Sequence, residues 1–279
     1  MDTTTPNDLA GASVGNSIPS RAEMLGWFVT HPAMYREFAR MTRNRIARAL
    51  RIEPDRNVDA VRGAAVCAES CIPAEEAYAR LGLAQGISLA ERYPEAWLEA
   101  ERRTAQVPVA MGGAANVELL YDVVRSLRPD RVLETGVALG WSSLAILLAL
   151  ESVGHGELVS IDMPYPGMNN DAFVGIAVPS HLHSRWTLIR RPDRDILKAT
   201  LRRFGPIDLA HYDSDKSRPG RAFAYPMLWE ALRPGGILIS DDIADNSVFD
   251  EFARHIQRDP IVIRKDVDNC LGILVKPGA

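Results

Sequence analysis

The spacing of apolar residues changes along the chain, and the change falls near residue 108. Before it, apolar residues recur three and four positions apart, as at Met34, Phe38 and Met41, a spacing that predicts amphipathic helices. Two segments have the form of capping boxes, with Ser followed three residues later by Glu: residues 20–23 and 88–91. We therefore expect residues 20–105 to be helical and to contain no strand.

After residue 108, short apolar runs alternate with longer amphipathic segments, a pattern typical of strands that alternate with helices. The predicted strands are residues 131–135, 157–162, 186–190, 207–212, 236–240, 261–264 and 271–276. The predicted helices between them are residues 116–127, 141–151, 196–204, 221–232 and 247–258. Long connections between the early strands indicate parallel crossovers, and the short last link indicates an antiparallel pair. The sequence thus predicts an α/β fold, with a doubly wound, mostly parallel seven-stranded sheet that has an antiparallel C-terminal strand, as in Rossmann-like proteins.

This pattern divides the chain into three parts. Residues 1–19 are rich in Thr, Gly, Ser, Asn and Pro and predict a disordered tail. Residues 20–105 form the helical N-terminal region, which we expect to act as a lid or in dimerisation. Residues 106–279 form the predicted catalytic domain.

Composition narrows the class of partner. Of the 279 residues, 47% are hydrophobic and 24% are charged, which is ordinary for a globular protein. The formal net charge is -4 and the pI about 5.9, so we expect no nucleic-acid partner, and we interpret the arginine-rich segment 36–51 as a solvated helix face. No segment approaches the ~20 apolar residues of a membrane span. The three cysteines, Cys67, Cys71 and Cys270, favour a reducing compartment, so we expect a cytoplasmic protein without a membrane segment.

A glycine-containing turn follows the first predicted strand, where ligands bind in doubly wound sheets. It contains Gly136 and Gly140, which let the backbone turn sharply and approach a ligand, ahead of a helix whose amide groups point at that ligand. Ala138 and Trp141 break a dinucleotide fingerprint, and the Gly-Lys-Ser/Thr of a triphosphate loop is absent from the sequence. The remaining pattern is E-x-G-x-x-x-G, beginning at Glu134.

Acidic residues follow the next strands. Asp162 ends the second strand, where a carboxylate can accept hydrogen bonds from both ribose hydroxyls. Asp193 follows the third strand, and two interpretations stay open for it: a contact to adenine or a solvated loop carboxylate.

The fourth and fifth strands also end in carboxylates: Asp213 and Asp215 after the fourth, and Asp241 and Asp242 after the fifth. Such a cluster repels itself unless protons or a cation neutralise it, and a divalent cation bound by carboxylates, waters and substrate oxygens meets that need. In the alternative, one Asp caps a helix, another is solvated and no metal binds.

The D-x-x-K arrangement of Asp213 and Lys216, with the acidic pair after residues 232–240, resembles class I S-adenosylmethionine-dependent methyltransferases. Within these it is most similar to the cation-dependent O-methyltransferases of the catechol and caffeoyl-CoA type and to bacterial natural-product methyltransferases. The resemblance covers roughly residues 108–276. It implies transfer of the activated methyl group to a hydroxyl of a small molecule.

The resemblance also implies a role for individual residues. Met111 and Gly112 would approach the methionine part of S-adenosylmethionine, Gly136 and Ser142 its carboxylate and amino groups, Asp162 the ribose and Asp193 the adenine. The implied cofactor site comprises Met111, Gly112, Glu134, Gly136, Gly140, Ser142, Asp162, Asp193 and Asp213. Asp213, Asp241 and Asp242 match three ligands of Mg²⁺ or another divalent cation. Lys216 and Asp213 match the catalytic residues, with Lys216 as the base.

Two departures keep other functions open. Asp242 stands where the catechol-type enzymes have Asn, and the N-terminal helices have no counterpart in the minimal catechol-type fold, so they predict a lid, a substrate wall or the interface of a homodimer. The alternatives are a metal-independent N- or O-methyltransferase and a non-methylating enzyme of the same fold that resembles cephalosporin hydroxylases.

Overall fold

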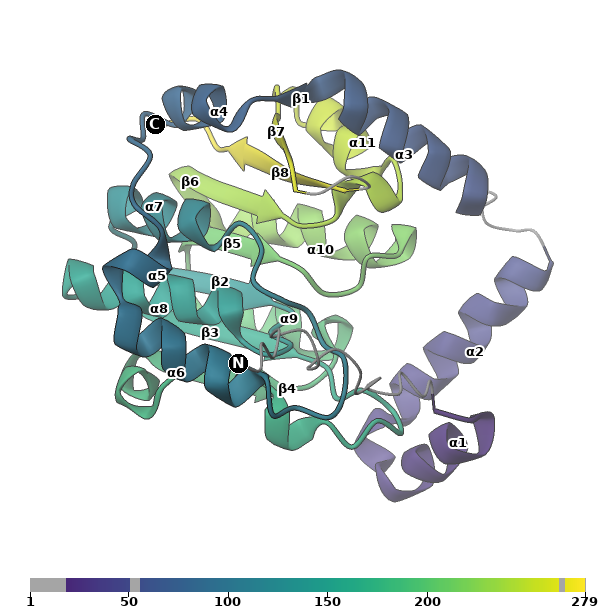
Figure 1. Cartoon of the computed structure of the whole chain (residues 1–279). Coiled ribbons are helices and arrows are strands. Elements are labelled where there is room, and N and C mark those ends of the chain that lie inside the picture. Colours follow the sequence, from purple (N-terminus) through teal and green to yellow (C-terminus); the bar gives the residue numbers. More distant parts are fainter. Residues whose placement is uncertain (1–18, 51–55, 266–268, 279) are drawn as a thin grey trace, which may run out of the picture.

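A mixed β-sheet lies at the centre of the protein, with helices on both faces (Figure 1). The computed structural model describes residues 19–50, 56–265 and 269–278, so nearly all of the expected tail lies outside the described residues. The strand order is β1-β7-β8-β6-β5-β2-β3-β4. The strands are β1 (Cys71–Ile72), β2 (Arg131–Thr135), β3 (Glu157–Asp162), β4 (Trp186–Arg190), β5 (Ile207–Tyr212), β6 (Leu232–Ser240), β7 (Ile261–Arg264) and β8 (Cys270–Val275).

The seven predicted strands are all present, and β8 pairs antiparallel with β6 and with β7, which confirms the predicted fold class. The remaining pairs are parallel, so the carboxyl ends of β2 to β7 lie at one edge of the sheet. This edge carries the ends of the strands from which we predicted a site.

The expectation that residues 20–105 contain no strand is wrong at one place. Cys71 and Ile72 form β1, which pairs parallel with β7 through Cys71↔Val262 and Ile72↔Ile263. Two residues are too few to show an alternating pattern, so only the tertiary contact with β7 reveals this strand.

The helices before residue 108 are α1 (Arg21–Thr30), α2 (Tyr35–Ala49), α3 (Arg56–Ser70), α4 (Ala74–Arg80), α5 (Leu89–Arg92) and α6 (Pro94–Thr104), with a 3₁₀ turn η1 (Pro32–Met34). Both predicted capping boxes are present, at Ser20 and Ser88. The later helices are α7 (Val117–Leu127), α8 (Trp141–Val153), α9 (Asp193–Phe204), α10 (Arg218–Ala231) and α11 (Val248–His255). No described helix has both the length and the hydropathy needed to cross a membrane.

Two hydrophobic layers cover the sheet. One contains α7 and α8 together with buried residues of α4, α5 and α6, such as Tyr78, Leu89 and Ala100. The other contains α9, α10 and α11. Helices α1 and α2 pack separately around Trp27 and Phe28, to one side of the sheet (Figure 1). The N-terminal helices therefore include a part that shares the core and a part, α1–α2, that stands beside it.

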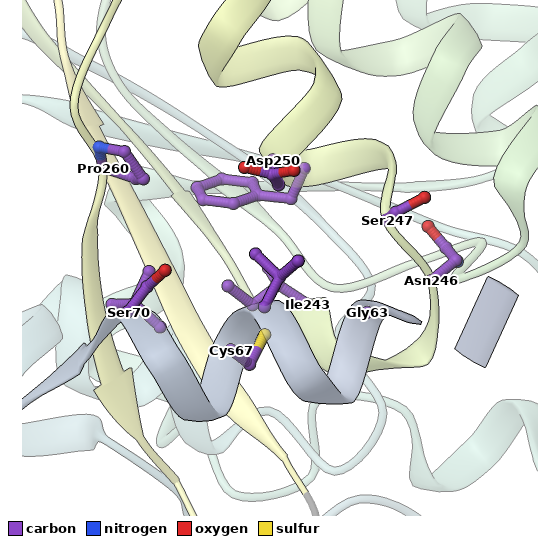
Figure 2. A pocket seen from close by; sticks show the side chains of 11 residues that line it. Gly63, Cys67, Ser70, Ile243, Asn246, Ser247, Asp250 and Pro260 are labelled. Carbon is purple, nitrogen blue, oxygen red and sulfur yellow. The ribbon is translucent and has the colours of Figure 1, made fainter. Parts of the chain in front are cut away.

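Helix α3 packs closely on the turn η4 (Ile243–Asp245) that follows β6. Figure 2 shows Gly63 and Cys67 on this helix facing Ile243 and Asn246. A Cβ at Gly63 would lie 2.6 Å from the Ala244 carbonyl oxygen, so only glycine permits this approach.

The structure also brings together thiols that are distant in sequence. The Sγ atoms of Cys71 and Cys270 lie 3.4 Å apart, and all three cysteines are free. Burial raises the pKa of the Cys67 thiol to about 11 and that of Cys270 to about 12, which makes both unreactive at neutral pH.

Candidate active site

The turn after β2 passes directly against the end of β5. Gly136 has φ +82°, and a Cβ there would lie 2.1 Å from the carbonyl oxygen of Asp213. The Gly136 amide donates to the Ile161 carbonyl at 2.8 Å, and the Asp213 amide donates to Thr135 at 2.8 Å. The turn is therefore held between the ends of β3 and β5, and Gly136 is needed for that contact.

Gly140 has a different role from the one expected. Its φ is +91°, but a Cβ there would meet the Cα of Gly175 at 2.8 Å. Ala138, itself at φ +48°, accepts a hydrogen bond from the Gly175 amide at 2.9 Å. The close backbone approach at Gly140 is therefore to the segment around Gly175, and its predicted place in the cofactor site stays a prediction.

Glu134 lies beneath the turn and is fully buried. It accepts hydrogen bonds from the hydroxyls of Ser142 at 2.6 Å, Ser143 at 2.5 Å and Ser160 at 2.7 Å, and His211 Nδ1 lies 3.4 Å away. Burial raises the pKa of Glu134, but the neighbouring His211 and the hydrogen bonds from the serines outweigh it and lower the pKa overall. Glu134 is fully buried and fixes the turn from inside, and its predicted place in the cofactor site stays a prediction.

Asp162 lies at the carboxyl end of β3 and is almost fully buried. Its Oδ2 accepts hydrogen bonds from the amides of Val137 at 2.8 Å and Ala138 at 3.2 Å, and its Oδ1 forms an ion pair with Arg190, its register partner on β4. Burial raises the pKa of Asp162 in spite of these partners. The carboxylate is thus aligned with the turn, as its predicted role requires.

Asp193 is the first residue of α9 and not part of a solvated loop. Its Oδ1 accepts from the Arg194 amide at 2.6 Å and its Oδ2 from the Ser214 hydroxyl at 2.9 Å. Only 8% of the residue is exposed, and burial raises its pKa. This removes the solvated-loop interpretation and ties Asp193 to the segment after β5.

The acidic residues after β5 and β6 come together as the sequence predicted. One carboxylate oxygen each of Asp213, Asp241 and Asp242 lies within 4.8 Å of the other two. Burial and the negative charge of Asp241 raise the pKa of Asp213. The neutralising charges come from two lysines: Lys216 Nζ is 3.0 Å from Asp213 and also contacts Asp242, and Lys265 Nζ is 2.6 Å from Asp241 and 2.9 Å from Asp242.

A cavity of about 1530 Å³ opens over this edge of the sheet. The predicted site residues that line it are Gly136, Asp162, Asp193, Asp213 and Lys216. Another wall comes from α1 and α2, where the apolar side chains of Met24, Leu25, Phe28, Phe38 and Met41 are accompanied by the polar side chains of Arg21, Glu37, Thr42, Asn44 and Arg45. Helices α1 and α2, which lie beside the sheet in Figure 1, therefore contribute one side of the cavity at the strand ends.

The other predicted site residues are not part of the cavity's described lining. A Cβ at Gly112 would lie 3.6 Å from that of Ala138, so this residue does adjoin the turn. Met111 accepts a weak contact from Asn170 Nδ2 at 3.8 Å. Ser142 is occupied by Glu134, and Asp241 and Asp242 face the lysines.

Several residues near the site were not predicted from the sequence. Lys265 follows β7, whose carboxyl end lies at the same edge as those of β5 and β6, so extending the strand-end rule to β7 would have found it. Arg190 at the end of β4 could have been found in the same way. The α1–α2 wall gave only a helical pattern, which does not show what a helix covers.

Comparison with known proteins agrees with this geometry. Residues 133–243 match a family described as "Methyltransferase domain", so the chain carries a methyltransferase domain. The class I methyltransferase resemblance of the sequence is thereby confirmed for these residues. No curated protein matches the chain.

Solved structures show the same fold. The O-methyltransferase TomG from Streptomyces achromogenes, involved in tomaymycin synthesis and solved with S-adenosylmethionine, is 19% identical, with a TM-score of 0.50 over 72% of this chain and 95% of that chain. Cofactor-bound Rv0187 from MTB is 18% identical, with a TM-score of 0.51 over 74% and 98%. An O-methyltransferase from Bacillus cereus, solved with S-adenosylhomocysteine, is 16% identical, with a TM-score of 0.50 over 65% and 90%. The fold is therefore that of Rossmann-like methyltransferases.

Proposed function

We propose that this protein is an S-adenosylmethionine-dependent O-methyltransferase that methylates a hydroxyl of a small molecule. One observation carries the proposal: a single cavity is lined by the turn at Gly136, by Asp162 and by the Asp213–Lys216 pair. The family resemblance implies that Gly136 and Asp162 bind the cofactor and that Asp213 and Lys216 take part in the reaction. The O-methyltransferases of the same fold support the choice of oxygen as the acceptor atom.

The residues at the carboxyl ends of β2, β3 and β4 fit the cofactor. Each carboxylate oxygen can accept about two hydrogen bonds. Asp162 Oδ1 has Arg190 as its partner and so retains capacity for a ribose hydroxyl. Asp193 lies one strand further along the same edge, where the resemblance expects adenine. S-adenosylmethionine would supply an electrophilic methyl group, so the main task of these residues is alignment of donor and acceptor.

The acceptor hydroxyl would lie beside Asp213 and Lys216. Their side chains are 31% and 35% exposed, whereas Asp241 and Asp242 behind them are 9% and 14% exposed. Asp213 and Lys216 are half-buried and line the cavity, so they can reach a ligand in it. A carboxylate and an ammonium group 3.0 Å apart offer a proton acceptor and a positive charge for the oxygen that loses its proton.

Helices α1 and α2 would cover the acceptor. Five apolar and five polar side chains of these helices line the cavity together with the acidic strand ends, which suits a substrate with an apolar body, polar substituents and a reactive hydroxyl. Arg40 of α2 forms an ion pair with Asp195 of α9 at 2.7 Å, which links α2 to a helix that packs on the sheet. This arrangement supports a lid role for this part of the N-terminal region.

The predicted divalent cation does not fit this arrangement. The ammonium groups of Lys216 and Lys265 already contact one oxygen each of Asp213 and Asp241 and both oxygens of Asp242, so a dication at this cluster would meet two positive charges. We therefore assign no step of the reaction to a metal. The homodimer, the cytoplasmic location and the lack of a nucleic-acid partner stay predictions.

Calorimetric titration of S-adenosylmethionine and S-adenosylhomocysteine into the purified protein tests the cofactor. Micromolar binding of both is expected, as is methyl transfer in a screen of phenols, catechols, sugars and polyketides. Failure of both compounds to bind would overturn the proposal. Binding without transfer to any hydroxyl would favour an N-methyltransferase or the hydroxylase-like alternative.

A further inference from the structure

Five side chains at the carboxyl ends of β5, β6 and β7 form a row of alternating charges. In order they are Asp241, Lys265, Asp242, Lys216 and Asp213, and each contacts the next. The row brings three carboxylates and two ammonium groups together, so its formal charge is -1 if all five are ionised. A cluster of three carboxylates alone would carry -3.

The two ends of the row differ in exposure. Lys265 is 16% exposed and Asp241 9%, whereas Lys216 and Asp213 are 35% and 31% exposed. Of these, only Lys216 and Asp213 belong to the described lining of the cavity. Lys265 therefore occupies the inner part of the row and contacts Lys216 only through Asp242.

The chain fixes Lys265 at this place. It directly follows β7, which runs parallel to β6 because both pair antiparallel with β8. Its backbone amide donates to the carbonyl of Asn269 at 2.9 Å, which ties the residue to the start of β8. Strand β7 thus places the ammonium group of Lys265 in the more buried part of a carboxylate cluster that would otherwise attract a cation.

We propose that Lys265 is a built-in cation that takes the place of a divalent metal, so that methyl transfer by this protein is independent of divalent cations. This inference rests on the proposed function and deepens it. Lys265 is a positioning residue: it fixes Asp242, and Asp242 in turn holds Lys216 beside the acceptor. A dication entering the cluster would have to displace an ammonium group that lies 2.6 and 2.9 Å from two carboxylates.

Manganese titration followed by electron paramagnetic resonance tests the proposal without requiring any methyl transfer. The variant Lys265→Met removes the charge but keeps the length of the side chain. We expect the wild-type protein to bind Mn²⁺ weakly and the variant to bind at least about tenfold more tightly. Adding Asp241→Asn to the variant should abolish the gain. Lys198→Met on the exposed face of α9 is the matched control, since it also removes one positive charge, and its Mn²⁺ binding should equal that of wild type.

Stoichiometric, tight Mn²⁺ binding by the wild-type protein, lost on Asp241→Asn, would overturn the proposal. Equal binding by Lys265→Met and wild type would do the same. If Lys265→Met does not fold, the wild-type titration still decides, and Lys265→Arg, which keeps the charge, should fold and bind Mn²⁺ as weakly as wild type.

The activity measurement separates this inference from the proposed function. Once an acceptor is found, wild-type turnover should be unchanged by EDTA, and the Lys265→Met variant should lose turnover but keep its affinity for S-adenosylmethionine. Turnover of wild type that stops in EDTA and returns with Mg²⁺ would overturn the built-in cation while confirming methyl transfer.

Discussion

Arg218 and Asp59 form an ion pair in which Nε and Nη2 of the guanidinium donate to both carboxylate oxygens, at 2.9 and 3.0 Å. Asp59 also accepts from the amide and the hydroxyl of Ser247, at 3.3 and 2.7 Å. One carboxylate of α3 therefore joins the start of α10 to the start of α11. Since Lys216 and Asp242 lie just before those helices, α3 fixes the spacing of the two segments that carry the reactive pair and its support.

The first prediction concerns the acid dependence of stability. The hydrogen bonds from Arg218 lower the pKa of Asp59 to about 2, against burial, which raises it. A lowered pKa in the folded state means that the ionised carboxylate stabilises the protein above pH about 4 and that this contribution is lost as the pH falls towards 2. Asp59→Asn should therefore reduce the free energy of unfolding by about 2 kcal/mol at pH 7.

Urea unfolding at neutral pH and between pH 4 and 2 measures this effect. Glu76→Gln is the control, because Glu76 forms an exposed pair with Arg80, for which an effect below about 1 kcal/mol is expected. Equal losses for the two variants would show that the Asp59 pair contributes no more than an ordinary surface pair.

The second prediction concerns the turn after β2. Gly136→Ala adds a Cβ 2.1 Å from the Asp213 carbonyl in a left-handed backbone conformation, so the turn or the end of β5 must move. We expect a loss of more than about 2 kcal/mol in the free energy of unfolding and loss of cofactor binding. Gly154→Ala is the matched control, because Gly154 has φ +89° with open space around it and should cost only about 1 kcal/mol. Similar losses in both would mean that the contact with Asp213 is not limiting.

The apolar pattern was sufficient to predict seven strands and, from their ends, the convergence of Asp213, Asp241 and Asp242. Strand periodicity is a local property, and the parallel order then follows from the connection lengths. The pattern could not show which partner neutralises a carboxylate. Glu134 lies near the end of β2 and Asp162 at the end of β3. The carboxylate of Glu134 is nevertheless enclosed by three serines, whereas Asp162 lines the cavity.

For the N-terminal helices, the sequence did not show what their apolar faces cover. Met41 and Phe38 have the spacing of a packed helix face, but they line the cavity opposite the sheet. The apolar face of a helix indicates burial against something, and a single sequence does not say whether that is a core or a substrate. The same holds for Asp59, whose partner Arg218 lies 159 residues away.

The third prediction concerns the ribose. Asp162→Ala removes the carboxylate that aligns the turn amides and that we propose as the ribose ligand. S-adenosylhomocysteine should then bind at least about tenfold more weakly in a calorimetric titration. Asp171→Ala is the control, because Asp171 also pairs with Arg190, at 2.6 Å, but is exposed. If Asp171→Ala weakens binding as much as Asp162→Ala, the effect comes from Arg190 and not from a carboxylate beside the ribose.

The last prediction separates the acceptor wall from the cofactor site. Phe38 of α2 is 38% exposed, and its ring faces the cavity opposite the strand ends, so an acceptor with an apolar body would cover part of the exposed surface. Phe38→Ala removes that contact and should raise KM for the acceptor about five- to tenfold, which corresponds to roughly 1 kcal/mol of lost apolar burial. The affinity for S-adenosylhomocysteine should not change, because Asp162, Gly136 and Asp193 lie on the other wall. Leu98→Ala on α6 removes an exposed apolar side chain that is not in the described lining, and it should leave both constants unchanged. If Phe38→Ala changes cofactor affinity and not KM, then α1 and α2 cover the cofactor and the acceptor must enter from another side of the cavity.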